Sequence, residues 1–214
     1  ISTFVKLYEE GLIYKGERMI NWDPEGLTAL SDEEVIHKEI KGKLWHIKYP
    51  ICDSDEYLIV ATTRPETMLG DTGVAINPKD KRFSKYIGKM IDLPIVNNQI
   101  PIFSDNYVDM DFGTGCVKVT PAHDPNDFEM AKRNNLKIIN IMDENGTLNN
   151  NVPSEYVGVD RFIARKKILK KLEELQLIDK IENHIHKVGF SERTDSIIEP
   201  RLSKQWFLKM DDFA

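Results

Sequence analysis

Hydrophobic residues occur along most of the chain in short runs, and these runs predict strands. Residues 57–61 form a continuous apolar run of the kind found in buried strands, whereas residues 45–49 alternate between apolar and polar side chains. Residues 94–96 and 100–103 flank Asn97-Asn98-Gln99 and predict a hairpin. Residues 12–48 predict further short strands separated by turns.

Three other segments have the spacing of helices. Residues 3–11 predict a short helix that stops at Gly11. A second helix is expected to begin near Asp127, with Asp124 or Asn126 as its cap. A third is capped by Asp160 and runs to about residue 175. Its buried stripe is expected to contain Ala164, Ile168, Leu172 and Leu175. The basic residues 165–167 and 170–171 are expected on a solvated face, with an RNA-binding patch as the alternative.

Many short strands with few helices define the expected fold class. Turns rich in Gly, Pro, Asn and Asp close these strands. The pattern predicts an α+β, mostly β fold, in which a β-barrel is decorated with short α-helices.

Two places where a strand gives way to a helix contain most of the candidate chemistry. Thr62 and Thr63 follow the strand at 57–61, and Pro65 suits the first turn of a helix. The strand at 116–120 similarly precedes the helix near Asp127. Backbone N–H groups, hydroxyls and the positive end of a helix converge at such junctions. We therefore expect the two junctions to face each other across one pocket.

The acidic and basic side chains near these junctions allow specific roles, each with a simpler alternative. A carboxylate at Asp127 can bind an ammonium group, or can merely complement the helix dipole. Asp124 either contacts a substrate or only caps the helix, and His123 is either a general base or a residue that shapes the pocket. Lys118 and Thr120 share one face of their strand, either in the pocket wall or on a half-exposed surface.

Residues 61–72 (ATTRPETMLGDT) and 113–128 (GTGCVKVTPAHDPNDF) resemble the editing domain inserted in class I aminoacyl-tRNA synthetases for valine, isoleucine and leucine. The flanking residues 21–24, 28–31 and 199–207 resemble the valyl-tRNA synthetase family. The resemblance implies the same barrel architecture. It also implies a flanking helix and connective ribbon at 1–44, an editing domain at 45–189, and return strands toward the synthetase catalytic domain at 190–214.

The resemblance also implies roles for individual residues. It places the amino-anchoring carboxylate at Asp127, and the expected catalytic residues are Asp127, Thr62, Thr63 and Lys118. Thr62, Thr63 and Thr67 offer donors to a carbonyl oxygen as it becomes tetrahedral. Arg64 is expected to contact the phosphate or ribose of the terminal nucleotide, or else to form a surface ion pair with Glu66 or a nearby Asp. Phe112 is expected to stack on a base, or else to pack in the core. The expected substrate-binding residues are Arg64, Thr67, Phe112, Thr120, Asp124 and His123.

The function that the resemblance implies is hydrolytic proofreading, the removal of threonine wrongly esterified to valine tRNA. Valine and threonine are nearly isosteric, and the known discrimination of a valine site against threonine is only about 10²-fold. The alternatives are a structural or RNA-docking insertion with a degenerate pocket, and the homologous editing domain of an isoleucyl or leucyl enzyme. Neither an HIGH-type nor a KMSKS-type ATP motif is present, so we expect no amino-acid activation from this chain.

Composition narrows the expected partners and cofactors. The chain has 214 residues and a net charge of −6, which predicts weak binding to the body of a tRNA. We therefore expect contact only with the 3′ CCA end, while the rest of the synthetase holds the tRNA. His123, Asp124 and Asp127 match no strong metal signature, so no metal or cofactor is expected in this domain; ATP and magnesium belong to the full synthetase. Two distant cysteines and the lack of a long apolar run predict a monomeric, cytoplasmic fragment that does not enter a membrane.

Overall fold

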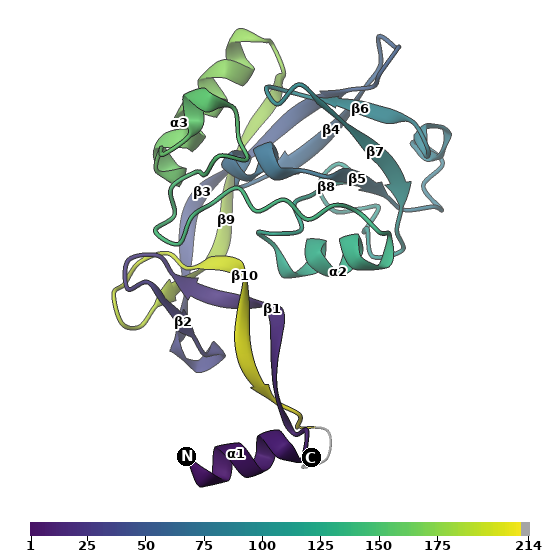
Figure 1. Cartoon of the computed structure of the whole chain (residues 1–214). Helices are drawn as coiled ribbons and strands as arrows, with labels where there is room; N and C mark the ends of the chain where they lie inside the picture. Colours follow the sequence, from purple (N-terminus) through teal and green to yellow (C-terminus); the bar gives the residue numbers. More distant parts are fainter. Residues whose placement is uncertain (211–214) are drawn as a thin grey trace.

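The computed structural model describes residues 1–210 and is built mainly from antiparallel strands (Figure 1). Its strands are β1 (Ile13–Asp23), β2 (Thr28–Leu30), β3 (Val35–Pro50), β4 (Tyr57–Thr62), β5 (Gly73–Ile76), β6 (Met90–Leu93), β7 (Asn98–Ser104), β8 (Cys116–Val119), β9 (Ile178–Ser191) and β10 (Glu199–Leu208). Its α-helices are α1 (Ser2–Glu9), α2 (Pro125–Arg133) and α3 (Arg161–Glu174). The short 3-10 helices are η1 (Asp32–Glu34), η2 (Pro65–Gly70), η3 (Ser84–Tyr86) and η4 (Ser154–Tyr156).

Within residues 1–210 the strands form three sheets. Their orders are β10-β1-β2, β4-β3-β9 and β6-β7-β5-β8, and the β5–β7 pair is parallel. None of these sheets closes on itself, so the mostly β class is confirmed but the closed barrel is not found.

One large apolar cluster packs the second and third sheets together with α3. Ile47, Tyr49, Leu58 and Val60 from β3 and β4 are fully buried in it. They alternate with less buried residues, as expected for a strand with one face toward the core. Residues of both β4 and η2 belong to this cluster, so both elements are anchored in the core.

The helix α3 follows its predicted pattern except at its end. Asp160 accepts hydrogen bonds from the backbone N–H groups of Phe162 and Ile163, as expected of a cap. The predicted stripe residues Ala164, Ile168 and Leu172 are buried. The prediction for Leu175 was wrong, since this side chain is 47% exposed. The helix ends at Glu174, so Leu175 lies at its C-cap, away from the face that packs on the core.

Several strands differ in length from the prediction. The segment expected to contain only short strands includes β1 and the 16-residue β3. Strand β3 pairs with β9 over most of its length, in a register that places Val35 opposite Ser191 and Ile47 opposite Ile178. The expected hairpin is present as β6 and β7, but the prediction of a strand at 94–96 was wrong, because Leu93 already pairs with Asn98 and residues 94–97 form the turn.

Strands β1 and β10 form a two-stranded ribbon that extends away from the core and ends near α1 (Figure 1). The helix α1 has no buried residue, and its Phe4 and Tyr8 rings pack edge-on against Trp206 of β10. The predicted domain boundaries at 44/45 and 189/190 fall inside β3 and β9 and remain a prediction. Residues 211–214 of the predicted return segment lie outside the described residues.

No helix in the described part of the chain is both long enough and apolar enough to cross a membrane.

Candidate functional site

One cavity of about 350 Å³ lies between the end of β4 and the segment from β8 to α2. The structure therefore brings the two predicted junctions together. The cavity is lined by all ten residues singled out from the sequence, which are Thr62, Thr63, Arg64, Thr67, Phe112, Lys118, Thr120, His123, Asp124 and Asp127.

At the first junction, hydrogen bonds within residues 62–67 fix the backbone. The Thr62 hydroxyl accepts the Arg64 N–H at 3.0 Å, and the Thr67 hydroxyl donates to the Arg64 carbonyl at 3.0 Å. Pro65 is the first residue of η2, as predicted, but the helix is a 3-10 helix whose residues are all buried. Such a short, tight turn keeps the threonines close to the end of β4.

At the second junction, two carboxylates have different partners. Asp124 caps α2, because its Oδ1 accepts the N–H groups of Asn126 at 2.8 Å and Asp127 at 3.3 Å. Asp127 Oδ2 accepts the backbone N–H of Thr120 at 2.8 Å. The side chain of Asp127 is therefore directed back toward the end of β8, where it lines the cavity wall.

Asp127 is a carboxyl group with an unusual affinity for protons. Burial, together with the nearby charge of Asp124, raises the pKa of Asp127 to about 7, although Lys118 and the hydrogen bond from Thr120 act in the opposite direction. Burial deprives the ionised carboxylate of hydrating water, and a bound cation would stabilise it by a charge-assisted hydrogen bond.

A buried polar network lies next to Asp127. Lys118 Nζ donates to Thr67 Oγ1 and Asp71 Oδ1, both at 2.9 Å, and to the Thr120 hydroxyl. Asp71 also accepts from the Thr120 hydroxyl and, at 2.6 Å, from the Tyr49 hydroxyl. An ammonium group has three donors, so Lys118 can contact a ligand only by releasing one of these partners.

Asp71 is a site residue that sequence reasoning missed, although it lies within the quoted motif at residues 61–72. Asp71 lies two residues before β5, and the pairing of β5 with β8 brings it close to Lys118. Neither segment alone indicates this pairing, so the contact could not be predicted from the sequence.

The environment of His123 supports the structural interpretation of this residue. Its Nε2 accepts the backbone N–H of Ile141 at 3.1 Å, so the ring proton is on Nδ1. That Nδ1 lies 3.6 Å from Glu199 Oε1. Burial lowers the pKa of His123 and keeps the ring neutral. Because its Nε2 lone pair already accepts a hydrogen bond, His123 cannot act as a general base toward a water molecule.

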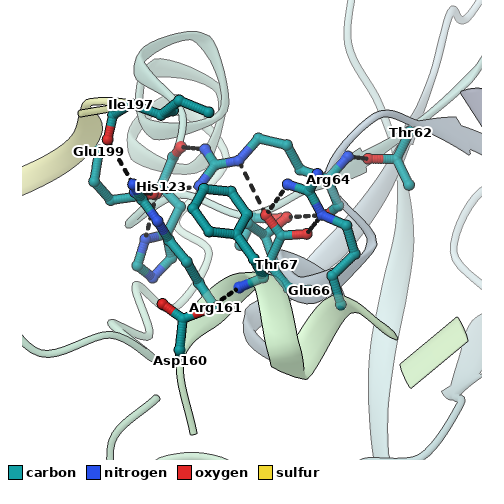
Figure 2. A network of polar contacts seen from close by, with 12 residues as sticks. Thr62, Arg64, Glu66, Thr67, His123, Asp160, Arg161, Ile197 and Glu199 are labelled. Atoms are coloured by element: carbon teal, nitrogen blue, oxygen red, sulfur yellow. Dashed lines mark hydrogen bonds and ion pairs between the residues drawn. The ribbon is translucent and has the colours of Figure 1, made fainter. Parts of the chain in front are cut away.

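Arg64 belongs to a cluster of buried charges, drawn in Figure 2. Its guanidinium donates to Glu199 and, at 3.0 Å, to the carbonyl of His123, and it lies 3.5 Å from Glu66. The predicted alternative, an ion pair with Glu66, is thus present, but Glu199 is a further partner that the sequence did not reveal. The cluster is completed by Arg161 on Glu199 and by Arg165 on Glu66. Arg165 is therefore engaged in an ion pair, whereas the sequence predicted a solvated helix face.

Phe112 lies at the cavity and is 69% exposed. This exposure excludes the alternative of core packing and leaves the ring available for stacking.

The geometry also bears on two other kinds of chemistry, metal binding and nucleophilic attack by a cysteine. Within residues 1–210, no three His, Cys, Asp or Glu side chains are grouped as a metal site would require. Cys116 also lines the cavity, but burial raises its pKa to about 12, so its thiol remains protonated and is a poor nucleophile.

Comparisons with known proteins show which family and fold the chain resembles. The family model of the leucyl-tRNA synthetase editing domain matches residues 84–186. The fold is similar to that of the LeuRS of Agrobacterium radiobacter K84 in its ternary complex with tRNA and LeuAMS. The TM-score is 0.51 at 18% identity, over 87% of this chain and 31% of that chain. Fold and family model together define the class, which is a synthetase editing domain.

Similarity over the whole of this chain then narrows the family of synthetase. The chain is 58% identical to the valine--tRNA ligase of Francisella tularensis and 57% identical to that of Geobacillus stearothermophilus, in each case over 100% of this chain. It spans only about a quarter of these relatives, 23% and 24% of their lengths. By homology, the chain is the editing domain of a valyl-tRNA synthetase, and the resemblance seen in its motifs is confirmed.

Proposed function

We propose that the chain hydrolyses the ester bond between threonine and valine tRNA, a post-transfer proofreading reaction. The observation that carries this proposal is the buried carboxylate of Asp127 in the wall of a cavity that several polar side chains line. The α-ammonium group of an aminoacyl ester is a cation that such a carboxylate would bind by a charge-assisted hydrogen bond. On the same wall, the Thr120 hydroxyl has a remaining lone pair for the threonine hydroxyl, and Lys118 could contact it by releasing one of its present partners.

The proposed reaction uses the two junctions in different ways. Asp127 holds the amino group while donors of Thr62 and Thr63 polarise the ester carbonyl. The oxygen of a water molecule attacks the carbonyl carbon, the bond to the ribose oxygen breaks, and the ribose hydroxyl recovers a proton. The neighbouring free hydroxyl of the terminal ribose assists, since His123 offers no base. Arg64 and the exposed Phe112 would contact the terminal nucleotide.

We expect the chain to deacylate threonyl-tRNA at least about tenfold faster than valyl-tRNA. The threonine hydroxyl can donate to the remaining lone pair of the Thr120 hydroxyl, whereas a valine methyl group cannot make this hydrogen bond. Single-turnover hydrolysis of the two esters on the same tRNA measures this ratio. Equal rates would contradict threonine specificity while leaving a general deacylase, and no hydrolysis of either ester would favour a degenerate docking insertion.

Hydrolysis is also expected to persist after exhaustive chelation. In the proposed mechanism Asp127 binds the ammonium group, and Thr62 and Thr63 donate hydrogen bonds to the ester carbonyl. No step therefore requires a metal-activated water. Threonyl-tRNA deacylation is measured before and after dialysis against a strong chelator. Activity that disappears and then returns on addition of zinc would overturn the metal-free mechanism.

The proposed partners follow from the same reaction. The acidic chain would receive only the 3′ CCA end of the tRNA, while the rest of the synthetase holds the tRNA body and supplies the ATP- and magnesium-dependent step.

A further inference from the structure

The two cavity walls come from segments that are distant in the sequence, and the side chains of Arg64 and Lys118 each connect them. Arg64 stands at the start of η2 in the first junction, and its Nη1 donates to the carbonyl of His123 in the second junction at 3.0 Å. Arg64 is therefore one of the contacts that fix the distance between the threonine wall and the Asp127 wall, beside the hydrogen bond from Lys118 to Thr67.

Glu199, the first residue of β10, contacts both of these residues (Figure 2). One of its oxygens accepts from Arg64 and lies 3.6 Å from His123 Nδ1. The other accepts from Arg161 Nη1 at 2.5 Å. Glu199 is only 4% exposed, and it lines neither of the two strand-to-helix junctions itself.

The charges around Glu199 keep its carboxylate ionised and paired with Arg64. Burial by itself would raise the pKa of Glu199, but the charges of Arg64 and Arg161 and the neighbouring His123 hold it well below its usual range. The carboxylate thus remains ionised, with cations on two sides. Three guanidinium groups, from Arg64, Arg161 and Arg165, share the two carboxylates of Glu66 and Glu199. Without Glu199, Arg64 would be left with Glu66 as its nearby carboxylate partner, at 3.5 Å.

Arg64 also stands between two cavities. A second cavity of about 290 Å³ is lined by Arg161, Arg165 and Glu199, and it shares Thr63, Arg64 and His186 with the first. If released from Glu199, the Arg64 side chain has open space on both sides, so its orientation is not enforced by packing alone.

We propose that Glu199 is a positioning residue for the editing reaction: through Arg64 and His123 it sets the separation between the two walls of the first cavity. This inference rests on the proposed function for its kinetic readout. Because β10 belongs to the ribbon sheet with β1, the same contact links the geometry of the cavity to the position of the ribbon.

The test is Glu199→Gln, which preserves size and removes the charge. A small misplacement of reacting groups lowers the rate of the chemical step, so we expect kcat for threonyl-tRNA to fall about 10- to 100-fold while KM changes less than about threefold. In an Arg64→Lys background the same substitution should have little further effect, because the two residues act as a unit. The matched control is Glu34→Gln, which removes the carboxylate from a guanidinium pair with Arg193 that borders neither of these cavities.

A second readout does not depend on activity. In the parent chain the Arg64 guanidinium is restrained by three partners, so its Nη groups should give separate NMR signals. We expect these signals to merge in Glu199→Gln and to remain separate in Glu34→Gln. If the parent chain hydrolyses no ester, the proposed function fails, and the Arg64 signals still decide the positioning role.

The inference is overturned if Glu199→Gln lowers only the melting temperature and leaves kcat per folded molecule unchanged, or if the Arg64 signals stay separate. Should Glu199→Gln fail to fold, Glu199→Asp is measured in the same way. That variant keeps the charge but shortens its reach, and it should give an intermediate loss of kcat.

Discussion

Replacing Asp127 by asparagine is expected to lower deacylation of threonyl-tRNA about 30- to 1,000-fold and at the same time to stabilise the fold. The loss corresponds to removing a charge-assisted bond to the substrate, on the order of 2–4 kcal/mol. The amide can still accept the Thr120 N–H, so the local structure has no reason to change. Deacylation kinetics and thermal unfolding of the same samples measure both effects.

The gain in stability follows from the raised pKa of Asp127. The folded chain keeps this proton up to a pH of about 7, whereas the unfolded chain releases it near pH 4. The free energy of unfolding therefore falls as the pH rises through this window. At pH 8 the asparagine variant should be more stable than the parent by roughly 1–3 kcal/mol, and this difference should vanish near pH 4.

The same pKa predicts that deacylation by the parent chain increases as the pH rises through about 7, since only the ionised carboxylate binds an ammonium group. Asp55→Asn, at an exposed position outside both cavities, is the control for a change in net charge. A folded Asp127→Asn variant with nearly normal activity would contradict the anchoring role.

Asp71→Ala is expected to cause the largest loss of stability, roughly 3–5 kcal/mol. Asp71 is 1% exposed and accepts from Tyr49, Lys118 and Thr120. Its removal leaves a buried ammonium without a counter-charge and a buried phenol without an acceptor. For a chain of this size the melting temperature should fall by roughly 6–20 °C.

A second substitution separates this explanation from general damage to the core. Lys118→Met in the Asp71→Ala background removes the uncompensated charge and should recover part of the lost stability. Asp55→Ala, which removes an exposed carboxylate, should leave the denaturation midpoint nearly unchanged. Denaturant titration of these variants is the measurement. If the double variant is less stable than Asp71→Ala, the charge-pair account is wrong.

Local signals in the sequence were sufficient for those parts of the structure that depend on neighbouring residues. The Asp124 and Asp160 caps act within three residues, so the starts of α2 and α3 could be predicted. The buried strand at 57–61 and the strand at 116–120 follow from runs of apolar residues, and the two junctions were predicted together with them. The resemblance then directed attention to the ten residues that share the first cavity.

Properties that depend on distant partners could not be predicted in this way. The length of β3 is set by pairing with β9, more than 130 residues away, and its exposed half has no apolar run to reveal it. The 3-10 form of η2 results from burial of every residue in a tight space beside α3. Asp71 and Glu199 escaped notice because a single carboxylate in a sequence carries no sign of the cations that the fold will bring to it.

The pairing of β1 with β10 also has a consequence for the order in which the chain is made. Residue Ile13 finds its partner Leu208 only after nearly the whole segment has been synthesised, and Arg64 likewise meets Glu199 135 residues later. Contacts of such long sequence separation form slowly, because a large loop must be closed first. A nascent chain would therefore carry a β1 strand without its β10 partner, and an incomplete cavity, until β10 leaves the ribosome. Such an exposed strand edge is prone to aggregation during translation.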